Sequence, residues 1–521
     1  MTVEAVSEGA VRPQARLRGR AWAGPAFATL ASGALYGAAF PPFSQSWLAW
    51  GALAPFFGAT TRVRPVAGAA LGGLFALSAG TATAWWLPEM LERFFDLPRP
   101  AADFALAGAL LGTAGLEIAA FGAWLAWLSR RGPVAPATVG IAWALTEWTR
   151  GEVGPLANPW ALLSHSQIDW AALSQIAELT GPHGVAFLAA SSSALLASLA
   201  FPALRGRHPA VQVLLFAALG SGALLYGQSR LGQSFDEGAP VRVAIVQADV
   251  TRHFSRIDGD SRAELERHLA LTEQAEARSA DFALWPEGAA DFFLDATNSR
   301  ALRLRSFSRK HPVDLVLGAP RREPSETGTR IYNSTLHLRG GRVQTHQDKL
   351  ELTPFSESQP LAPVLSWGSS ELTAGDAVQL LEVGTLQLGS LICSEAMGSR
   401  AARERASAGA TLLINPSNDY WFAAESGAAQ QLQKSRLRAI ETRRWLARAT
   451  PTGYSAIVDA HGTVRAIGRF GASDLVVGEV FGATTTTLST RYGGAFGPAL
   501  FGSWLLLTLL HAKRFAAERK S

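Results

Sequence analysis

The chain has 521 residues, of which 48% are hydrophobic and only 17% are charged, and its formal net charge is +5. Soluble globular proteins average about 25% charged residues, so this composition excludes an ordinary soluble protein along its whole length. No basic stripe with interleaved aromatic residues occurs, so we expect no nucleic-acid partner. Residues 21–61 contain no charge, whereas residues 237–479 contain many. The sequence therefore divides into an apolar part and a part with the composition of a globular domain.

Eight apolar segments are candidates for membrane-spanning helices, which need about 20 mostly apolar residues. Seven of them precede the charged region, at residues 22–40, 45–61, 66–88, 103–128, 134–149, 183–204 and 209–228, and the eighth follows it at 492–512. The second and fifth are short for a bilayer. A soluble bundle of buried core helices is the alternative, but it does not predict a regular placement of charges between the helices.

Clusters of Arg and Lys flank alternate apolar segments. They precede the first segment and follow the second, fourth, sixth and eighth, so helices that alternate in direction place all of them on one side of the membrane. Positive loops stay in the cytoplasm, which puts the globular region on the opposite, outer face. We therefore expect a cytoplasmic segment over 1–20, a membrane domain over 21–230, an outer domain over 240–485, a transmembrane helix over 492–512 and a cytoplasmic tail over 513–521.

Strand and helix patterns alternate through the outer domain. Runs rich in β-branched and other apolar residues predict strands at 241–247, 281–285, 313–318, 332–338, 386–392 and 410–415. Helical patterns are found at 261–279 and 425–447, and residues 453–464 are typical of a hairpin. Such alternation indicates an α/β fold in which helices cover the faces of the sheets.

Cys393 is the only cysteine of the chain, and it follows an apolar run. A single cysteine cannot form an intrachain disulfide, which leaves packing, a metal site or nucleophilic chemistry as its role. No cluster of His and Cys surrounds it, so we expect no metal. Two other polar residues stand out in the same domain: Glu287 ends an apolar strand, and Lys349 precedes a turn.

A thiol, a carboxylate and an amine are the groups that an acyl-transfer site needs. A carboxylate can take the proton of a thiol and later return it to a leaving group, a role that suits Glu287. A positive charge and a backbone N–H stabilise the oxyanion of a tetrahedral intermediate, which suits Lys349. Each residue alone also has a structural explanation: a packed cysteine, a solvated strand end and a surface lysine. The interpretation depends on the three motifs together.

These motifs resemble those of the nitrilase (carbon–nitrogen hydrolase) superfamily. They are Trp285-Pro286-Glu287, Lys349 with Pro354-Phe355-Ser356-Glu357 after it, and Cys393-Ser394-Glu395. Apolar segments lie on both sides of these motifs, and in this arrangement almost the whole chain is similar to the apolipoprotein N-acyltransferase family. The resemblance extends to Glu147-Trp148-Thr149-Arg150, Asn158-Pro159-Trp160, Tyr332-Asn333-Ser334 and the segment 415–422. It implies a multi-span α-helical membrane domain joined to an α/β nitrilase-like αββα sandwich.

The resemblance also implies an activity, a ping-pong acyl transfer in the bacterial inner membrane with the catalytic domain in the periplasm. Cys393 would take an acyl chain from the sn-1 ester of a phospholipid and pass it to the N-terminal amine of an S-diacylglyceryl-cysteine apolipoprotein. Glu287 would be the general base and acid, and Lys349 would stabilise the oxyanion. Membrane lipids would surround the helices, no cofactor would be needed, and we expect a monomer.

Further residues receive roles from the same resemblance. Supporting roles fall on Glu357, Glu395 and Ser394, and the candidates for substrate binding are Asn333, Asn415, Asn418, Trp421, Phe422 and Trp160. Several positions depart from the motifs of the family, and three of them bear on the motifs above. Ser356 stands where glycine is usual, Ser394 where an aromatic residue is frequent, and Asn158 where phenylalanine is usual. These departures affect the expected lipid contacts and leave the three catalytic candidates unchanged.

Two other classes of function stay open. A membrane-anchored amidase or nitrilase would use the same three residues and give the acyl group to water, although an anchor needs only one helix. A transporter or sensor whose outer domain only binds a ligand would have no need of the three residues.

Overall fold

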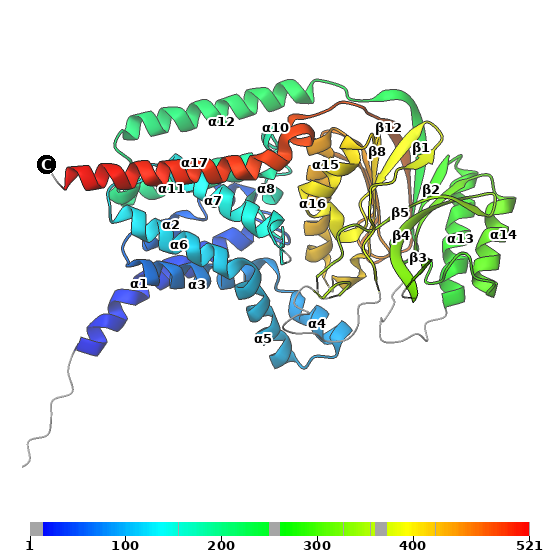
Figure 1. Ribbon diagram of the computed structural model, residues 1–521, viewed down its shortest axis with the longest axis horizontal. Helices are drawn as coiled ribbons and strands as arrows, with labels where there is room; N and C mark the ends of the chain where they lie inside the picture. Colours follow the sequence, from blue (N-terminus) through cyan, green and yellow to red (C-terminus); the bar gives the residue numbers. More distant parts are fainter. Residues whose placement is uncertain are drawn as a thin grey trace, which may run out of the picture.

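The computed structural model describes residues 14–154, 156–249, 261–326, 328–354, 356–359, 372–422 and 424–519. Figure 1 shows an elongated molecule with a helical part at one end and two sheets with their covering helices at the other. Phe355 of the predicted turn and residues 1–13 of the predicted cytoplasmic segment lie outside the described residues.

The helical part contains the N-terminal helices and the C-terminal one. Their bounds are α1 Gln14–Ala38, α2 Ala54–Thr60, α3 Pro65–Thr83, α4 Leu87–Phe95, α5 Arg99–Leu110, α6 Leu116–Ser129, α7 Pro136–Glu152, α8 Leu163–Ser166, α9 Ala171–Ser174, α10 Ala177–Thr180, α11 Pro182–Ala200, α12 Pro209–Leu231 and α17 Leu488–Glu518. Among the described residues, five stretches are long and apolar enough to cross a membrane: α3, α5 continued into α6, α11, α12 and α17. α7 has 17 residues and is shorter than these.

The prediction of a single spanning helix over 45–61 is wrong. This segment forms a short 3-10 helix, Ser46–Trp50, followed by the seven-residue α2. Gly51 caps the first helix and Pro55 lies in the first turn of the second. Seven residues rise only about 10 Å, against a hydrocarbon core of about 30 Å. The segment is apolar because it is buried among other helices, as the fully buried Phe56 and Phe57 illustrate.

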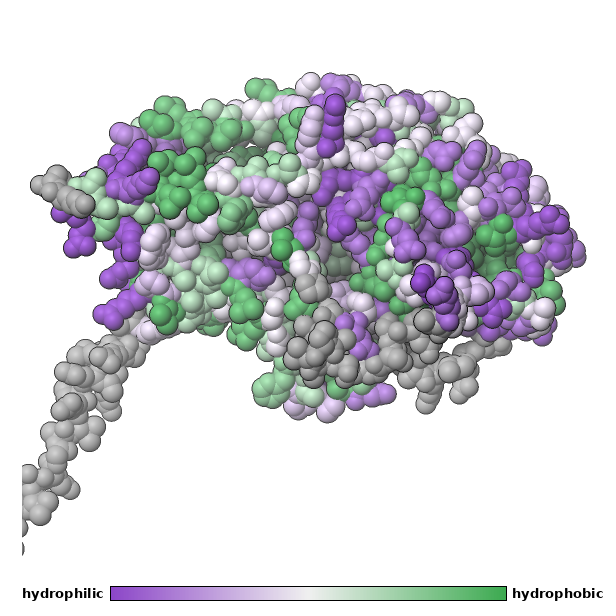
Figure 2. Space-filling model, in the orientation of Figure 1, coloured by the Kyte–Doolittle hydropathy of each residue, from purple (hydrophilic) through white to green (hydrophobic). Residues whose placement is uncertain are grey.

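The surface of the molecule changes character along its length. Figure 2 shows hydrophobic residues gathered over the flank of the helical part, and hydrophilic residues at its outer end and over much of the sheet part. In α12 and α17 only 11% of the apolar window is buried inside the protein. Apolar helices that expose most of their surface suit a bilayer, in which the backbone hydrogen bonds are satisfied within each helix.

The other part of the molecule is built on two six-stranded sheets, with the strand orders β12-β1-β2-β3-β4-β5 and β11-β10-β9-β8-β7-β6. The strands are β1 Glu237–Gln247, β2 Phe282–Leu284, β3 Asp314–Ser325, β4 Gly328–Arg339, β5 Arg342–Asp348, β6 Leu381–Val383, β7 Leu386–Ser390, β8 Leu412–Pro416, β9 Leu446–Ala449, β10 Ala456–Val458, β11 Val464–Ile467 and β12 Asp474–Gly482. β1, β2 and β3 are parallel neighbours, as are β7, β8 and β9.

The sheets pack face to face with helices on their outer faces (Figure 1). α13 (Ser261–Ala277) and α14 (Ser299–Lys310) share a core with the first sheet, and α15 (Ser399–Ser407) and α16 (Glu425–Thr442) share one with the second. A third core, which includes Ile245 of the first sheet, fills the space between the two sheets. The predicted αββα sandwich beside a helical membrane part is therefore confirmed.

One predicted helix is too long. The helix expected over 425–447 ends at Thr442, because Arg443 adopts a left-handed backbone with a φ of +52°. The chain then continues as β9, a strand that the sequence analysis did not predict. β9 lies between β8 and β10 and is buried along its whole length, so it lacks the alternation of polar and apolar residues that marks a half-buried strand.

α16 also joins the two parts of the molecule. Gln430 on this helix accepts a hydrogen bond from Trp160 Nε1 at 2.7 Å. Its own amide donates to the carbonyls of Pro41 and Thr83 at 3.1 and 2.9 Å. The amine of Lys434, one turn further along, lies 2.8 Å from the centre of the Trp160 ring. The second sheet is therefore held against the helical part through its own covering helix.

Candidate active site

The three residues predicted to be catalytic come from strand ends in both sheets. Glu287 follows β2 and Lys349 follows β5 in the first sheet, whereas Cys393 follows β7 in the second and begins the 3-10 helix Cys393–Ala396. β2 and β7 each have a parallel neighbour. The loops after the carboxyl ends of parallel strands are where α/β proteins place their ligands.

The turn that carries Glu287 packs closely on β3. A Cβ atom at Gly318 would lie only 2.5 Å from the Cα atom of Glu287, so this close approach requires glycine. The N–H of Gly318 donates to the carbonyl of Pro286 at 3.2 Å, and its carbonyl accepts from Ala290 N–H at 3.1 Å. These contacts fix the backbone from which the carboxylate projects.

Lys349 is buried between two carboxylates. Its side chain is 1% exposed, and Nζ lies 2.6 Å from Glu357 Oε2 and 3.5 Å from Glu287 Oε1. Burial by itself lowers the pKa of an amine, but Glu287, Glu357 and the Cys393 sulfur raise the pKa of Lys349 above its ordinary value. Burial likewise raises the pKa of Glu357, and the lysine outweighs this and lowers it. The site therefore contains a fixed ammonium and a fixed carboxylate at neutral pH.

Asn333 bridges the two glutamates. Its Nδ2 lies 2.8 Å from Oε1 of Glu287 and 2.8 Å from Oε1 of Glu357. The N–H of Thr353 donates to Glu357 Oε2 at 2.7 Å. In the described part of the chain, Oε2 of Glu287 is buried with no hydrogen-bond partner. One oxygen of Glu287 is thus held by Asn333 and Lys349, and the other is available to take a proton.

Cys393 adopts an unusual backbone conformation. Its φ is +51°, in the left-handed region that costs a residue with a side chain about 1–3 kcal/mol and that is concentrated at functional sites. Loss of water around the sulfur and the charge of Glu287 raise the pKa of the thiol, whereas Lys349 and the N–H of Asn418 lower it. The net change is upward, so Cys393 rests as a thiol and needs a base to become a nucleophile.

Glu395 holds the backbone on both sides of the site. It is fully buried and pairs with Arg405 at 2.8 Å. Its two oxygens accept the N–H of Leu350 at 2.9 Å and the N–H of Ile392 at 2.8 Å. The residue after Lys349 and the residue before Cys393 are therefore joined through one carboxylate.

Ser394 makes a second connection between the sheets. Its hydroxyl lies 2.9 Å from Thr353 Oγ1. The same Thr353 oxygen accepts a hydrogen bond from Lys349 Nζ at 3.3 Å. The serine that replaces the usual aromatic residue thus contributes a polar contact near the lysine.

Asn415 and Ser417 contact the cysteine from β8 and the segment after it. Asn415 Nδ2 donates to the carbonyl of Leu391 at 2.5 Å and to that of Cys393 at 3.4 Å. The hydroxyl of Ser417 lies 3.7 Å from the Cys393 sulfur. Asn415, a predicted substrate-binding residue, holds the backbone of the nucleophile in this structure.

Sequence reasoning missed Ser417 and an ion pair behind it. Ser417 donates to Asp419 Oδ1 at 3.0 Å, and Arg448 Nη2 lies 2.5 Å from the same oxygen. Ser417 and Asp419 fall inside the motif 415–422, so the motif could have indicated them. Arg448 belongs to β9, which was not recognised because its first two residues were assigned to the predicted helix over 425–447.

The predicted aromatic residues form a group that reaches the helical part. The ring of Phe422 lies 5.5 Å from Trp160 and 5.2 Å from Trp86, and Trp421 lies 5.0 Å from Phe94 of α4. The position of Trp86 near the end of an apolar segment is typical of an aromatic belt at the membrane surface, and Phe94 was not predicted. The segment after Asn418 is therefore connected to the helical part by aromatic contacts.

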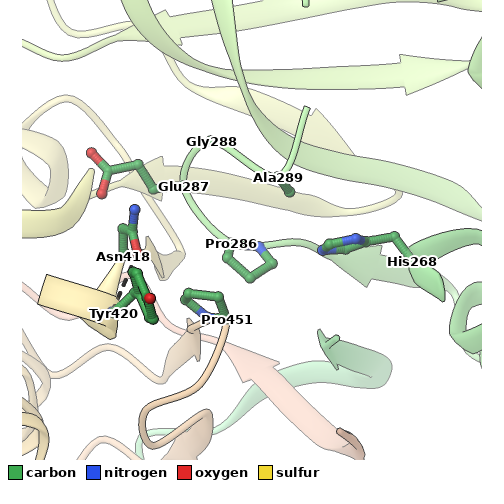
Figure 3. Close-up of a pocket in the computed structure, with 8 residues that line it drawn as sticks. All are labelled: His268, Pro286, Glu287, Gly288, Ala289, Asn418, Tyr420 and Pro451. Atoms are coloured by element: carbon green, nitrogen blue, oxygen red, sulfur yellow. Dashed lines mark hydrogen bonds between the residues drawn. The ribbon is translucent and has the colours of Figure 1, made fainter. Parts of the chain in front are cut away.

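A pocket opens beside the carboxylate of Glu287 (Figure 3). It is lined by His268, Pro286, Glu287, Gly288, Ala289, Asn418, Tyr420 and Pro451. In this view the side-chain amide of Asn418 points toward Glu287. Asn418, a predicted substrate-binding residue, thus shares a pocket with the predicted base. No group of three or more His, Cys, Asp or Glu residues that could hold a metal ion occurs within the ranges that the structure describes.

Known proteins resemble both parts of the chain. Family models match residues 32–195 as an apolipoprotein N-acyltransferase N-terminal domain and residues 242–487 as a carbon–nitrogen hydrolase. The chain is 30% identical to an apolipoprotein N-acyltransferase of Methylococcus capsulatus, over 91% of this chain and 92% of the relative, and 28% identical to one of Geobacter metallireducens, over 93% and 94%. Among solved structures, the nitrilase-superfamily protein Nit3 of Saccharomyces cerevisiae is 19% identical, with a TM-score of 0.39, over 50% of this chain and 96% of that one. The chain belongs to the apolipoprotein N-acyltransferase family.

Proposed function

We propose that this protein transfers an acyl chain from the sn-1 position of a phospholipid to the N-terminal amine of an S-diacylglyceryl-cysteine apolipoprotein, through a thioester on Cys393. The observation that carries the proposal is that Glu287, Lys349 and Cys393 lie close together in a protein whose described residues include five helices long and apolar enough to cross a membrane. Both substrates are lipids, so the enzyme that joins them must work at a bilayer surface.

In the first half-reaction Glu287 acts as the general base. Its free oxygen takes the thiol proton, and the sulfur attacks the ester carbonyl. Lys349 is an ammonium that interacts with Glu287 and the Cys393 sulfur, and it stabilises the negative charge that develops on the carbonyl oxygen. The ester C–O bond then breaks, Glu287 returns the proton to the departing alkoxide, and a lysophospholipid leaves.

In the second half-reaction the lipoprotein amine attacks the thioester carbonyl. Glu287 takes a proton from the attacking nitrogen, and the C–S bond breaks as the amide forms. The sulfur leaves as a thiolate and recovers a proton from Glu287, which restores the starting state. The raised pKa of the thiol favours this recovery, because a thiolate whose thiol has a raised pKa takes up a proton more readily.

We place the protein in the bacterial inner membrane with its catalytic part in the periplasm. The support is that basic residues of separate loops lie together: Arg62 stacks on Phe201, just before Arg205 and Arg207, and Arg207 pairs with Glu518 of α17. Positively charged loops remain in the cytoplasm. The proposed partners are the phospholipid donor, the diacylglyceryl apolipoprotein acceptor and the surrounding membrane lipids, and the proposed active form is a monomer.

The amidase alternative is not favoured. An amidase would need the membrane only as an attachment, for which one helix is enough. The similarity to apolipoprotein N-acyltransferases covers the helical part as well as the sheets. The many contacts of α16 with the helical part also tie the site to the membrane.

Replacement of Cys393 by Ala tests the proposal. The purified protein in detergent is incubated with phospholipid and a synthetic diacylglyceryl-cysteine peptide, and both peptide and protein are examined by mass spectrometry. We expect the unaltered protein to gain the mass of one acyl group and to release a triacylated peptide, and Cys393→Ala to do neither. A triacylated peptide formed by Cys393→Ala would refute the thioester route, and release of free fatty acid without acylated peptide by the unaltered protein would favour a hydrolase.

A further inference from the structure

Three buried side chains, Ser417, Asp419 and Arg448, form a chain of successive contacts that leads away from the Cys393 sulfur. The Ser417 hydroxyl lies 3.7 Å from the sulfur and 3.0 Å from Asp419 Oδ1, and Arg448 pairs with that carboxylate at 2.5 Å. Ser417, Asp419 and Arg448 are each at most 1% exposed. Gly453 encloses the carboxylate, because a Cβ there would lie 2.3 Å from Asp419 Oδ2. This chain of contacts is not needed for the roles given above to Glu287 and Lys349.

A serine hydroxyl has one proton to donate, and here it has two acceptors within reach. While Cys393 is a neutral thiol, the Asp419 carboxylate is the stronger and nearer acceptor, and the 3.7 Å contact with sulfur is correspondingly long. When the sulfur becomes a thiolate, it is itself a charged acceptor. The preference of the hydroxyl then depends on how strongly Asp419 competes.

We propose that the Ser417 hydroxyl donates to Asp419 or to the Cys393 sulfur according to the charge of the sulfur. Asp419 and Arg448 are positioning residues that determine which acceptor the hydroxyl prefers. This inference rests on the proposed function only in taking Cys393 as the nucleophile. On loss of the thiol proton to Glu287, the Ser417 hydroxyl turns from Asp419 to the sulfur and keeps its own proton. Arg448 still pairs with Asp419, so the buried carboxylate tolerates the loss of one donor. When the sulfur is acylated and uncharged, the hydroxyl returns to Asp419.

The charges around the sulfur make this uncharged donor useful. Glu287, from the turn after β2, raises the pKa of the thiol, and Lys349, at the end of β5, lowers it. Glu395, on the same 3-10 helix as the cysteine, is paired with Arg405. Behind Ser417, the charge of Asp419 is balanced by Arg448. Ser417 and the backbone N–H of Asn418 therefore stabilise the thiolate without adding a net charge to the site.

The chain offers a direct probe, because Cys393 is its only cysteine. The rate of alkylation by iodoacetamide, followed by intact-protein mass spectrometry across a range of pH, measures the thiolate fraction at this one position, with no acyl substrate present. For Ser417→Ala we expect the pH midpoint of alkylation to rise by about one unit, which slows the reaction about tenfold below the midpoint. For Asp419→Asn we expect the midpoint to fall, since the charge of Arg448 is then unbalanced near the sulfur.

A matched control exists elsewhere in the same domain. Ser399 donates to Glu441 at 3.2 Å, and Glu441 pairs with Arg438 at 2.8 Å, so this buried serine, carboxylate and guanidinium repeat the pattern without the sulfur. Ser399→Ala should leave the alkylation midpoint unchanged. A midpoint in Ser417→Ala that coincides with that of the unaltered protein would overturn the proposal. So would equal shifts in Ser417→Ala and Ser399→Ala, which would indicate a general effect of lost packing. Failure of Cys393→Ala to abolish acyl transfer would overturn the proposed function and leave these alkylation results standing.

Discussion

The two sheets supply unlike groups to the same site. The first sheet contributes charges that are paired with one another: Lys349 lies between Glu287 and Glu357, and Asn333 bridges the two carboxylates. The second sheet contributes a neutral thiol that lies 3.7 Å from the hydroxyl of Ser417, with an ion pair behind that hydroxyl. The acid–base groups and the nucleophile therefore come from separate walls, which we call the charged wall and the thiol wall.

This division explains why the charged groups are already ionised while the thiol stays protonated and unreactive. On the charged wall, mutual pairing fixes the ionisation of Lys349 and Glu357 whether or not substrate is present. On the thiol wall, the raised pKa keeps Cys393 protonated until a base removes the proton. Because hydrogen bonds of Ser394 and Glu395 also join the two walls, single substitutions can test whether a change in one wall alters the other through charge or through these contacts.

The largest effect is expected from removal of the lysine. Lys349→Met leaves two carboxylates buried side by side, and breaking a buried ion pair in this way costs about 3–5 kcal/mol of stability. It also removes the group assigned to the oxyanion, so we expect acyl-enzyme formation to slow by about 100-fold or more. A single-turnover assay with phospholipid measures this rate, and a melting curve in detergent measures the loss of stability. A variant that keeps the original single-turnover rate would remove Lys349 from the proposed mechanism.

Glu287→Gln should slow acyl transfer but accelerate the alkylation of Cys393. Without the general base, acyl transfer should fall by about 100-fold to 10,000-fold. The carboxylate charge also raises the pKa of Cys393, so its loss should lower that pKa and make iodoacetamide alkylation faster at a given pH. Measurement of both rates on one preparation separates the roles. Slower alkylation together with slower transfer would instead indicate a collapsed site.

Glu357→Gln should weaken the charged wall in a pH-dependent way. The folded pKa of Glu357 lies below its ordinary value, so its ionised form contributes stability above the ordinary carboxyl pKa. That contribution is lost as the pH falls through the lower, folded pKa. We expect the variant to lose about 1–3 kcal/mol of stability at pH 7, and the difference from the unaltered protein to shrink in acid. Glu382→Gln, on the exposed face of β6, is the control and should show no such pH dependence. A constant difference at all pH values would contradict the pairing.

In each wall the sequence indicated one part of the site and left another part hidden. Glu287 and Cys393 each follow an apolar run, whose end can be located from the periodicity of one segment alone, whereas Lys349 follows the mostly polar strand β5 and was indicated by its motif. The bridging role of Asn333 could not be predicted, because it depends on two glutamates that are brought together from separate loops. Arg448 was hidden for a different reason: a buried arginine in a short central strand after an Arg-rich helix has no pattern that separates it from that helix.

The smallest effect is expected where the two walls touch through hydroxyl groups. Ser394 and Thr353 lie 2.9 Å apart, and Thr353 also accepts a hydrogen bond from Lys349. Ser394→Ala removes one neutral hydrogen bond, which is worth about 0.5–1.5 kcal/mol, so acyl transfer should stay within about tenfold of the original rate. Thr353→Val should cost somewhat more because it also removes an acceptor of the lysine.

A double-mutant cycle decides whether the contact transmits the position of Lys349 to the thiol wall. If it does, the combined Ser394→Ala and Thr353→Val variant should be no slower than Thr353→Val alone, because both changes break the same connection. If the two losses simply add, the hydroxyl groups act independently. In that case the backbone contacts of Glu395, which tie the residue after Lys349 to the residue before Cys393, are the connection that keeps the walls in register.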